Sequence, residues 1–161
     1  MYSDKESDAG HTVVGMTESA MENMGIFDGD TVAIKGKRGK KTVATVAMVS
    51  DSDASSLGGP SANADSSVLS FTIGMSQDAM KNSGVRSGDA VTVVPAPDVK
   101  FGKAVLILPY QDSLESAGVA GTGDERIFDE YIRPYFEGKF RTMHRGDSFH
   151  IDGPMGLLEF Q

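Results

Sequence analysis

The feature that most constrains this chain is an internal repeat. Residues 14–34 align without a gap with residues 73–93, at an offset of 59 residues. Nine of the 21 aligned positions are identical, and three of the shared residues in each copy are glycines. Four further positions are conservative pairs. The sequence therefore predicts two similar structural units within one chain.

Each copy predicts a strand, a short helix, a turn and a second strand. Thr17 and Ser76 stand where helix N-caps are expected, and Gly25 and Gly84 can supply the left-handed residue that ends a helix. The expected turns and second strands are Gly29-Asp30 with residues 31–34, and Gly88-Asp89 with residues 90–93. One unit cannot bury its apolar side alone, whereas two can close around a pseudo-twofold axis as a β-barrel. The recurring methionines are expected in the core rather than as ligands.

Charge and composition exclude several classes of function. The net charge of -8 repels phosphate backbones, which disfavours nucleic acid as a partner. The chain has no cysteine, so disulfides, thiolate nucleophiles and Cys-ligated zinc are excluded. His11, His144 and His150 show no metal-ligand spacing, so no metal site is predicted.

The sequence shows no sign of export or membrane insertion. It has no apolar run long enough to span a bilayer, and residues 1–10 lack the basic start and apolar stretch of a secretory signal. We expect residues 1–10 to be a flexible N-terminus and the protein to be cytoplasmic, with the nucleus, the ER surface or another organelle as alternatives. Between the copies, seven of the 18 residues at 50–67 are Ser, which predicts a mobile surface loop.

Four blocks in register resemble the N-terminal domain of the valosin-containing-protein family of AAA ATPases, possible divergent paralogues included. They are FDGDTV at 27–32 with KGK at 35–37; PAPDVKFGK at 95–103, continued to 109; Phe128, Tyr131, RPYF at 133–136, Phe140-Arg141 and Gly146-Asp147; and Met155 with Glu159-Phe160. The resemblance runs from about residue 11 to residue 161. It implies a mainly β fold with short helices, in which a double-psi β-barrel (11–107) precedes a small four-stranded β-barrel (108–161).

The resemblance implies that this chain is a binding domain and not an enzyme. It would dock adaptors for a ubiquitin-directed segregase that extracts and unfolds proteins, as in ER-associated degradation. The sequence has no Gly-x-x-x-x-Gly-Lys-Ser/Thr phosphate loop, so no cofactor is expected here, and ATP and magnesium would belong to the ATPase modules of the parent protein. The parent would be a homohexamer and the isolated domain a monomer. Alternatives are a paralogue that binds trafficking or translocation factors, a double-psi barrel enzyme, and a DNA-binding relative.

The resemblance also implies a cleft between the two subdomains that binds ubiquitin-regulatory-X domains and valosin-interacting helices. The matching positions are Val13, Phe27, Thr45, Ala47, Lys100, Phe101 and Phe140. Thr45 and Ala47 are smaller than the aliphatic residues usual in the family, and Asp28 replaces a frequent arginine. Each lost branched side chain would cost roughly 1.5–3 kcal/mol of apolar burial, so we expect weaker binding of the usual adaptors.

A second surface is implied on the smaller subdomain, where short linear motifs would add as a strand. Its residues are Phe128, Tyr135, Phe140, Asp147 and Met155. For each of them the alternative is a buried core position.

Two further patterns have simpler structural explanations. Lys35, Lys37, Arg38, Lys40 and Lys41 form a basic run that predicts a hairpin tip rather than a nucleic-acid patch. Asp30, Asp89 and Asp147 each follow a glycine, which favours turn residues over acid/base catalysts. A pyruvoyl-dependent decarboxylase would require a Gly-Ser cleavage site, and the chain has no Gly-Ser dipeptide.

Overall fold

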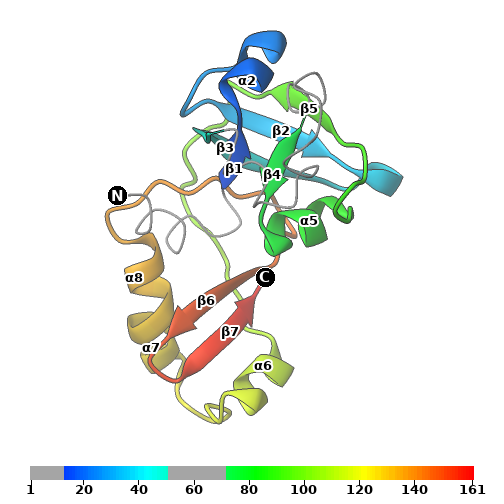
Figure 1. Ribbon diagram of the computed structural model, residues 1–161. Helices are drawn as coiled ribbons and strands as arrows, with labels where there is room; N and C mark the ends of the chain where they lie inside the picture. The colour runs from blue at the N-terminus through cyan, green and yellow to red at the C-terminus, as the bar shows by residue number, and fades with distance from the viewer. Residues whose placement is uncertain (1–12, 51–71) are drawn as a thin grey trace.

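The computed structural model describes residues 13–50 and 72–161, which form two lobes (Figure 1). The larger lobe is a curled sheet of five strands, half of a barrel, in the order β4-β1-β3-β2-β5. Its elements are β1 (Val13–Met16), α2 (Glu18–Met24), β2 (Thr31–Lys35), the 3₁₀ turn η2 (Lys37–Gly39), β3 (Lys41–Met48), β4 (Ile73–Met75), α5 (Gln77–Ser83) and β5 (Thr92–Pro95). Residues 1–10 and nearly all of the Ser-rich segment 50–67 lie outside the described residues.

The two copies of the repeat have the same local structure. The hydroxyl of Thr17 accepts a hydrogen bond from the backbone N–H three residues ahead at 3.2 Å, and the hydroxyl of Ser76 does the same at 3.1 Å. Gly25 and Gly84 end the helices with φ values of 64° and 68°, in the left-handed region that glycine adopts most readily. The predicted caps are therefore confirmed.

The Gly-Asp turns are also built alike. The carboxylate of each aspartate accepts a hydrogen bond from the backbone N–H three residues earlier, at 2.9 Å for Asp30 and 3.0 Å for Asp89. Asp147 in the smaller lobe does the same at 3.2 Å. All three therefore stabilise a turn, as predicted. The strand expected at 90–93 lies slightly later, at 92–95.

Strand pairing shows that the two copies are related by a local twofold axis. β1 and β4 run antiparallel, and Gly15 faces Gly74, its own counterpart in the repeat. β2 and β5 also run antiparallel, and Ile34 faces its counterpart Val93. A residue faces its own equivalent only where a twofold axis passes between the two. The twofold relation between the two copies is therefore visible in two separate strand pairs, β1–β4 and β2–β5.

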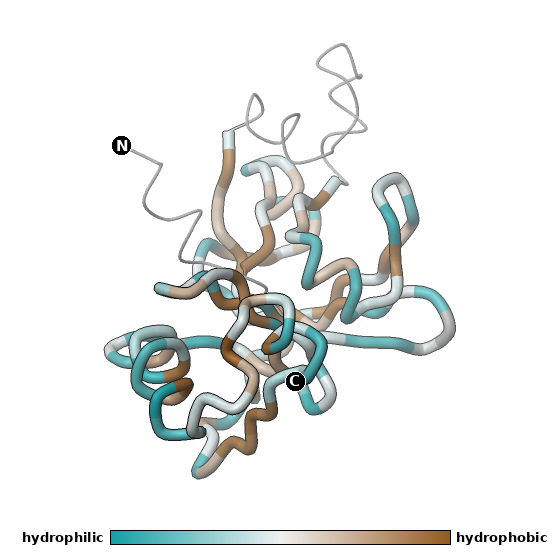
Figure 2. Tube along the Cα trace, turned by 90° about the horizontal axis from the view of Figure 1, so that it is seen from below, coloured by the Kyte–Doolittle hydropathy of each residue, from teal (hydrophilic) through white to brown (hydrophobic). Residues whose placement is uncertain are grey.

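The concave side of the sheet holds the core of the larger lobe. Alternate residues of the strands point inward, together with the apolar faces of the repeat helices. In Figure 2 most hydrophilic stretches follow the outer loops and helices, and apolar stretches lie both near the middle of the view and along its lower edge. The buried residues are Val14, Met16, Ala20, Met21, Ile26, Val32, Ile34, Ala44 and Val46. Met16 and Met21 therefore lie in the core, as the repeat predicts.

The smaller lobe differs from the four-stranded barrel that the resemblance implies, because residues 108–161 contain two strands. Its elements are α6 (Gln111–Ser116), α7 (Asp124–Ile127), the π turn η3 (Phe128–Ile132), α8 (Arg133–Phe136), β6 (Phe149–Gly153) and β7 (Gly156–Phe160). Ile127, Tyr131 and Tyr135 recur every four residues and are all buried, so residues 124–136 form a helical run with one apolar face.

Candidate functional site

Three of the predicted cleft residues lie together on the convex face of the sheet. Val13 in β1 faces Thr45 in β3, and Ala47 is two residues further along β3 on the same face. All three are half-buried, whereas the alternate residues of β3 point into the core. This face of the sheet therefore presents three small, half-buried side chains.

Phe101 and Phe140 form an exposed pair of aromatic rings. Phe101 belongs to the segment that links the lobes, and Phe140 lies in the segment between α8 and β6. Their ring centroids are 5.9 Å apart and the rings are tilted, which is a favourable aromatic arrangement. The two side chains are 87% and 91% exposed, more than any other large hydrophobic side chain in the described residues. Lys100, beside Phe101, is also exposed.

Phe27 is also exposed, at 73%, at the start of the first Gly-Asp turn. Within the described residues it has no ring contact with the Phe101–Phe140 pair. The neighbouring Asp28 accepts a hydrogen bond from the backbone N–H of Met48 at 2.8 Å, which fastens this turn to the end of β3. Asp28 therefore stabilises this turn, at a position where the valosin-containing-protein family often has arginine.

The residues of the predicted linear-motif surface are divided between surface and core. Phe128 and Phe140 are exposed, and Met155 is half-buried. Tyr135 is buried, with its ring stacked on Phe149 at 5.4 Å between centroids.

On the far side of the Tyr135 ring lies the guanidinium of Arg141, 3.7 Å from the centroid. This stacking is a cation–π contact. Arg141 also donates a hydrogen bond to the Tyr135 carbonyl at 2.8 Å. Tyr135 is therefore fixed within the lobe instead of standing open to a ligand.

Asp147, the remaining residue of that surface, is buried at the junction of the two lobes. Its carboxylate accepts a hydrogen bond from the Thr42 hydroxyl of β3 at 2.6 Å. Burial raises the pKa of Asp147, and the hydrogen bonds from Thr42 and from the His144 backbone act in the opposite direction. Close by, the Thr142 hydroxyl donates to the Val43 carbonyl at 3.4 Å. The two lobes are thus joined by polar contacts along β3.

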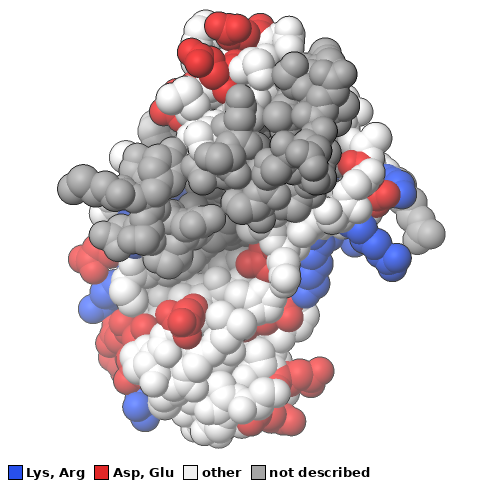
Figure 3. Space-filling view, viewed as in Figure 1, with Lys and Arg blue, Asp and Glu red and all other residues white. Residues whose placement is uncertain are grey.

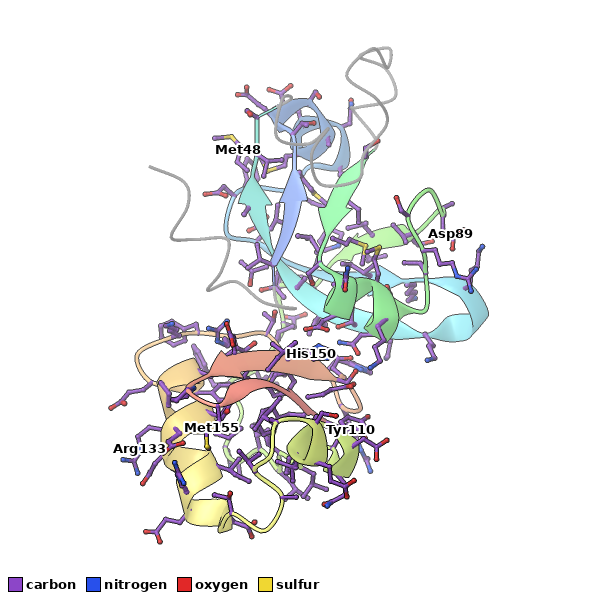
Figure 4. The ribbon with its side chains drawn as sticks, turned by 60° about the horizontal axis from the view of Figure 1, so that its bottom comes forward. Met48, Asp89, Tyr110, Arg133, His150 and Met155 are labelled. Atoms are coloured by element: carbon purple, nitrogen blue, oxygen red, sulfur yellow. The ribbon has the colours of Figure 1, made fainter. Side chains whose placement is uncertain are left out.

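A second junction, which the sequence did not reveal, connects α5 to the smaller lobe. The side-chain amide of Asn82 donates to the Ser148 carbonyl at 2.8 Å and accepts from the Ser148 backbone N–H at 2.8 Å. Asp78 accepts from the His150 backbone N–H at 3.0 Å and lies 2.7 Å from its ring Nδ1. Figure 4 shows His150 on β6, close to α5. These side chains occupy the edge of β6 where an added strand would bind.

The same junction includes an ion pair between Lys81 and Glu159. The hydrogen bond to Glu159 raises the pKa of Lys81. His150 Nε2 lies 3.7 Å from the second Glu159 oxygen. Asn82 is repeated as Asn23 in the first copy, and this identity was the one signal that marked the position in the sequence.

In residues 13–50 and 72–161 no group of three or more His, Asp or Glu side chains is placed to hold a metal ion. No helix in the same residues combines the length and apolar character needed to cross a membrane. No model of a known protein family matches this chain.

Proposed function

We propose that this chain is an adaptor-docking domain like the N-terminal domain of the valosin-containing-protein family. The observation that carries the proposal is the exposed aromatic pair of Phe101 and Phe140. Two phenyl rings left in water forgo roughly 1.5–3 kcal/mol of burial each, which a partner can recover by covering them. Aromatic side chains of this kind are frequent anchors of protein interfaces.

The position of the pair supports a cleft between the lobes. Phe101 lies in the segment that links the lobes. Phe140 lies in the segment between α8 and β6, which also contains Asp147, the residue that binds Thr42 of β3. Val13 of β1 and Thr45 and Ala47 of β3 add half-buried side chains on one face of the sheet. On this proposal a partner is held mainly by the two rings. On this proposal the domain docks ubiquitin-linked adaptors on behalf of its parent protein. Hexamer formation and ATP turnover are properties of the parent protein.

The repeat supports the finer proposal that the larger lobe is a double-psi β-barrel. β3 lies parallel to β1 and antiparallel to β2. The twofold axis that exchanges the copies requires a sixth strand parallel to β4 and antiparallel to β5. Such a strand would fill the position between the two edges of the curled sheet and close it. Among the described residues no strand occupies this position.

Amide hydrogen exchange tests the closed barrel. If a sixth strand is present, the outward amides of β4 and β5 should exchange at least about tenfold more slowly than an open edge allows, because both strands would be paired on both sides. The amide of Gln161, which follows β7 and donates to the Leu108 carbonyl at 2.9 Å, serves as a reference for an edge position that the chain itself pairs. Rapid exchange along both β4 and β5 would show that the sheet stays open.

Binding of adaptors is tested by titrating the chain with three ligands. These are a ubiquitin-regulatory-X domain, a helical valosin-interacting peptide and a short strand-forming peptide. Phe101→Ala and Phe140→Ala should each weaken the ligand that uses the cleft by about tenfold or more, because each removes an anchor worth more than about 1.4 kcal/mol. Leu157→Ala on β7, which removes another exposed apolar side chain, is the matched control and should leave the affinity unchanged.

Two results would reject the proposal. One is the failure of all three ligands to bind at about millimolar concentration, the range in which even weak recognition is detectable. The other is binding that Phe101→Ala and Phe140→Ala leave intact while both variants remain folded.

A further inference from the structure

A shallow basic hollow lies on the larger lobe. It is lined by Lys37, Lys40, Gly84, Arg86 and Asp89, and its volume is about 350 Å³. Figure 3 shows Lys and Arg side chains gathered at this side of the molecule, while Asp and Glu dominate the visible surface of the smaller lobe. With a net charge of -8, the chain concentrates positive charge here against its average.

The hollow is built by the hairpin tip that follows the first copy of the repeat, and by the end of α5 and the turn of the second copy. The β2–β3 hairpin tip supplies the lysines, and its Gly36 lies against the end of α5, where an added Cβ would stand 2.0 Å from the Ser83 carbonyl oxygen. The Lys40 side chain crosses Gly84, so that a Cβ there would be 2.9 Å from its Cδ. The second Gly-Asp turn then adds Arg86 from the other copy. The cations therefore come from a closely packed junction of two rigid elements.

The hollow has more positive than negative charge. Lys37 Nζ forms an ion pair with Asp89 at 2.7 Å, and this contact lowers the pKa of the Asp89 carboxyl. Lys40 and Arg86 form no ion pair within the described residues, although the charge of Arg86 also helps to lower the pKa of Asp89. Two of the three cations are thus available to a ligand, and the third is shared with an internal carboxylate.

We propose that this hollow binds an acidic segment of a partner protein, whose carboxylates pair with Lys40 and Arg86. The hollow is open and polar, unlike the enclosed and mostly apolar sites that hold small molecules. A short acidic peptide needs few cations, and guanidinium binds carboxylate in a bidentate manner. A nucleic acid would bring many phosphates against a chain of net charge -8. The site is separate from the Phe101–Phe140 pair and does not depend on the function proposed above.

The probe is a short peptide of alternating Glu and Gly, compared with the peptide in which each Glu is Gln. Binding to the full chain is measured by calorimetry or NMR titration at about 50 mM and about 200 mM salt. We expect the Glu peptide to bind and to weaken with salt, and the Gln peptide not to bind. Lys40→Gln and Arg86→Gln should each lower the affinity by about threefold to tenfold.

The sharpest variant is Asp89→Asn, because it should strengthen binding. Asn retains an oxygen for the turn hydrogen bond but releases Lys37, so the affinity should rise by about threefold. The repeat provides the matched control. Asp30→Asn changes the equivalent turn, which has no lysine partner in the described residues, and should leave the affinity unchanged. Arg133→Gln removes the same charge from α8 in the other lobe, far from Asp89 (Figure 4), and should also have little effect.

Four other outcomes would each overturn the proposal. Equal binding of the Gln peptide would show that carboxylates are not recognised. An equal loss for Arg133→Gln and Arg86→Gln would show a response to net charge rather than a site. Tighter binding of a single-stranded oligonucleotide of the same charge than of the Glu peptide would point to nucleic acid as the partner. Unchanged or weaker binding by a folded Asp89→Asn variant would show that Lys37 is not part of the site.

Discussion

One side-chain geometry occurs three times in this chain with different consequences. In Asp30, Asp89 and Asp147 the carboxylate accepts a hydrogen bond from the backbone N–H three residues earlier. Asp30 does only this in the described contacts, Asp89 also binds Lys37, and Asp147 also binds Thr42 across the lobe junction. The local sequence predicts the turn, because Gly-Asp favours it in any setting. The further partner of each carboxylate depends on the tertiary structure and cannot be read from neighbouring residues.

The burial of Asp147 predicts a specific pH dependence. Its pKa is raised in the folded state, so the folded protein binds this proton more tightly than the unfolded chain. Its contribution to stability is complete below the usual carboxyl pKa and is lost as pH rises through the raised value. In Asp147→Asn this loss should disappear, because the amide keeps the oxygen that accepts from Thr42 and does not titrate.

The measurement is the free energy of unfolding in urea for both proteins, from about pH 3 to pH 7. The free energy of unfolding of the wild type, relative to that of the variant, should decrease as pH rises. The imidazole of His144, 3.8 Å from the carboxylate, is the other titratable group at this site, and its own titration is followed by NMR. A difference that stays constant over the whole range would contradict the expectation.

At the scale of elements, α2 and α5 are equivalent in sequence and different in use. Both are capped alike and both pack on the same sheet. Only α5 contacts the smaller lobe in the described residues, through Asp78, Asn82 and Lys81. The repeat predicted the helices themselves, whereas their different surroundings depend on which copy the smaller lobe packs against.

The equivalent asparagines make this difference measurable. Asn82→Ala removes two hydrogen bonds to the backbone of Ser148, so we expect a loss of about 1–3 kcal/mol in the free energy of unfolding. Asn23→Ala changes the same position of the exposed copy and should stay within about 0.5 kcal/mol of wild type. Urea denaturation of both variants provides the comparison. Equal effects in the two copies would show that the α5 junction contributes nothing to stability.

Replacing Gly36 at the hairpin tip by alanine should destabilise the protein. Gly36 has an ordinary φ of -98°, so Gly36→Ala introduces no backbone strain, but its Cβ would overlap the Ser83 carbonyl oxygen. We expect a loss of about 2 kcal/mol or more, because a backbone atom cannot move aside as a side chain can. Gly123→Ala, where nothing lies within 4 Å of the new Cβ, should cost at most about 1 kcal/mol, the difference between Gly and Ala at a helix N-cap. Thermal unfolding of the pair tests this, and a stable Gly36→Ala protein would contradict the packing described here.

At the scale of the whole molecule, the sequence predicted the repeat unit better than what lies beyond it. Caps, turns and the strands 31–34 were correctly predicted because short-range hydrogen bonds determine them. The helical run 124–136 was missed, although Ile127, Tyr131 and Tyr135 have helical spacing, because the resemblance implied a four-stranded barrel over these residues. A wide π turn directly before Pro134 lets the helix continue past a residue without an N–H. For the candidate site, the sequence named Phe101 and Phe140 but could not place them in contact.

The two lobes should be held together partly by Asp78. In Asp78→Ala the backbone N–H of His150 loses its acceptor, so its amide should exchange with solvent about tenfold or more faster. Amides at the centre of β2 and β3 should keep their protection, because that pairing does not involve the smaller lobe. Hydrogen exchange followed by NMR measures both sets at once. Unchanged exchange at His150 would show that α5 does not control this edge.

The pairing of Gly15 with Gly74, and of Ile34 with Val93, has a consequence for the origin of this lobe. Contacts between identical positions are what an isologous interface between two separate subunits produces. A shorter ancestral polypeptide with one copy would form the same contacts with a second molecule of itself. Gene duplication and fusion would then turn that homodimer into a single chain. Fused halves would be free to differ, and in this chain only the second copy has Asp78 and Lys81, which bind the smaller lobe, where the first has Ser19 and Glu22.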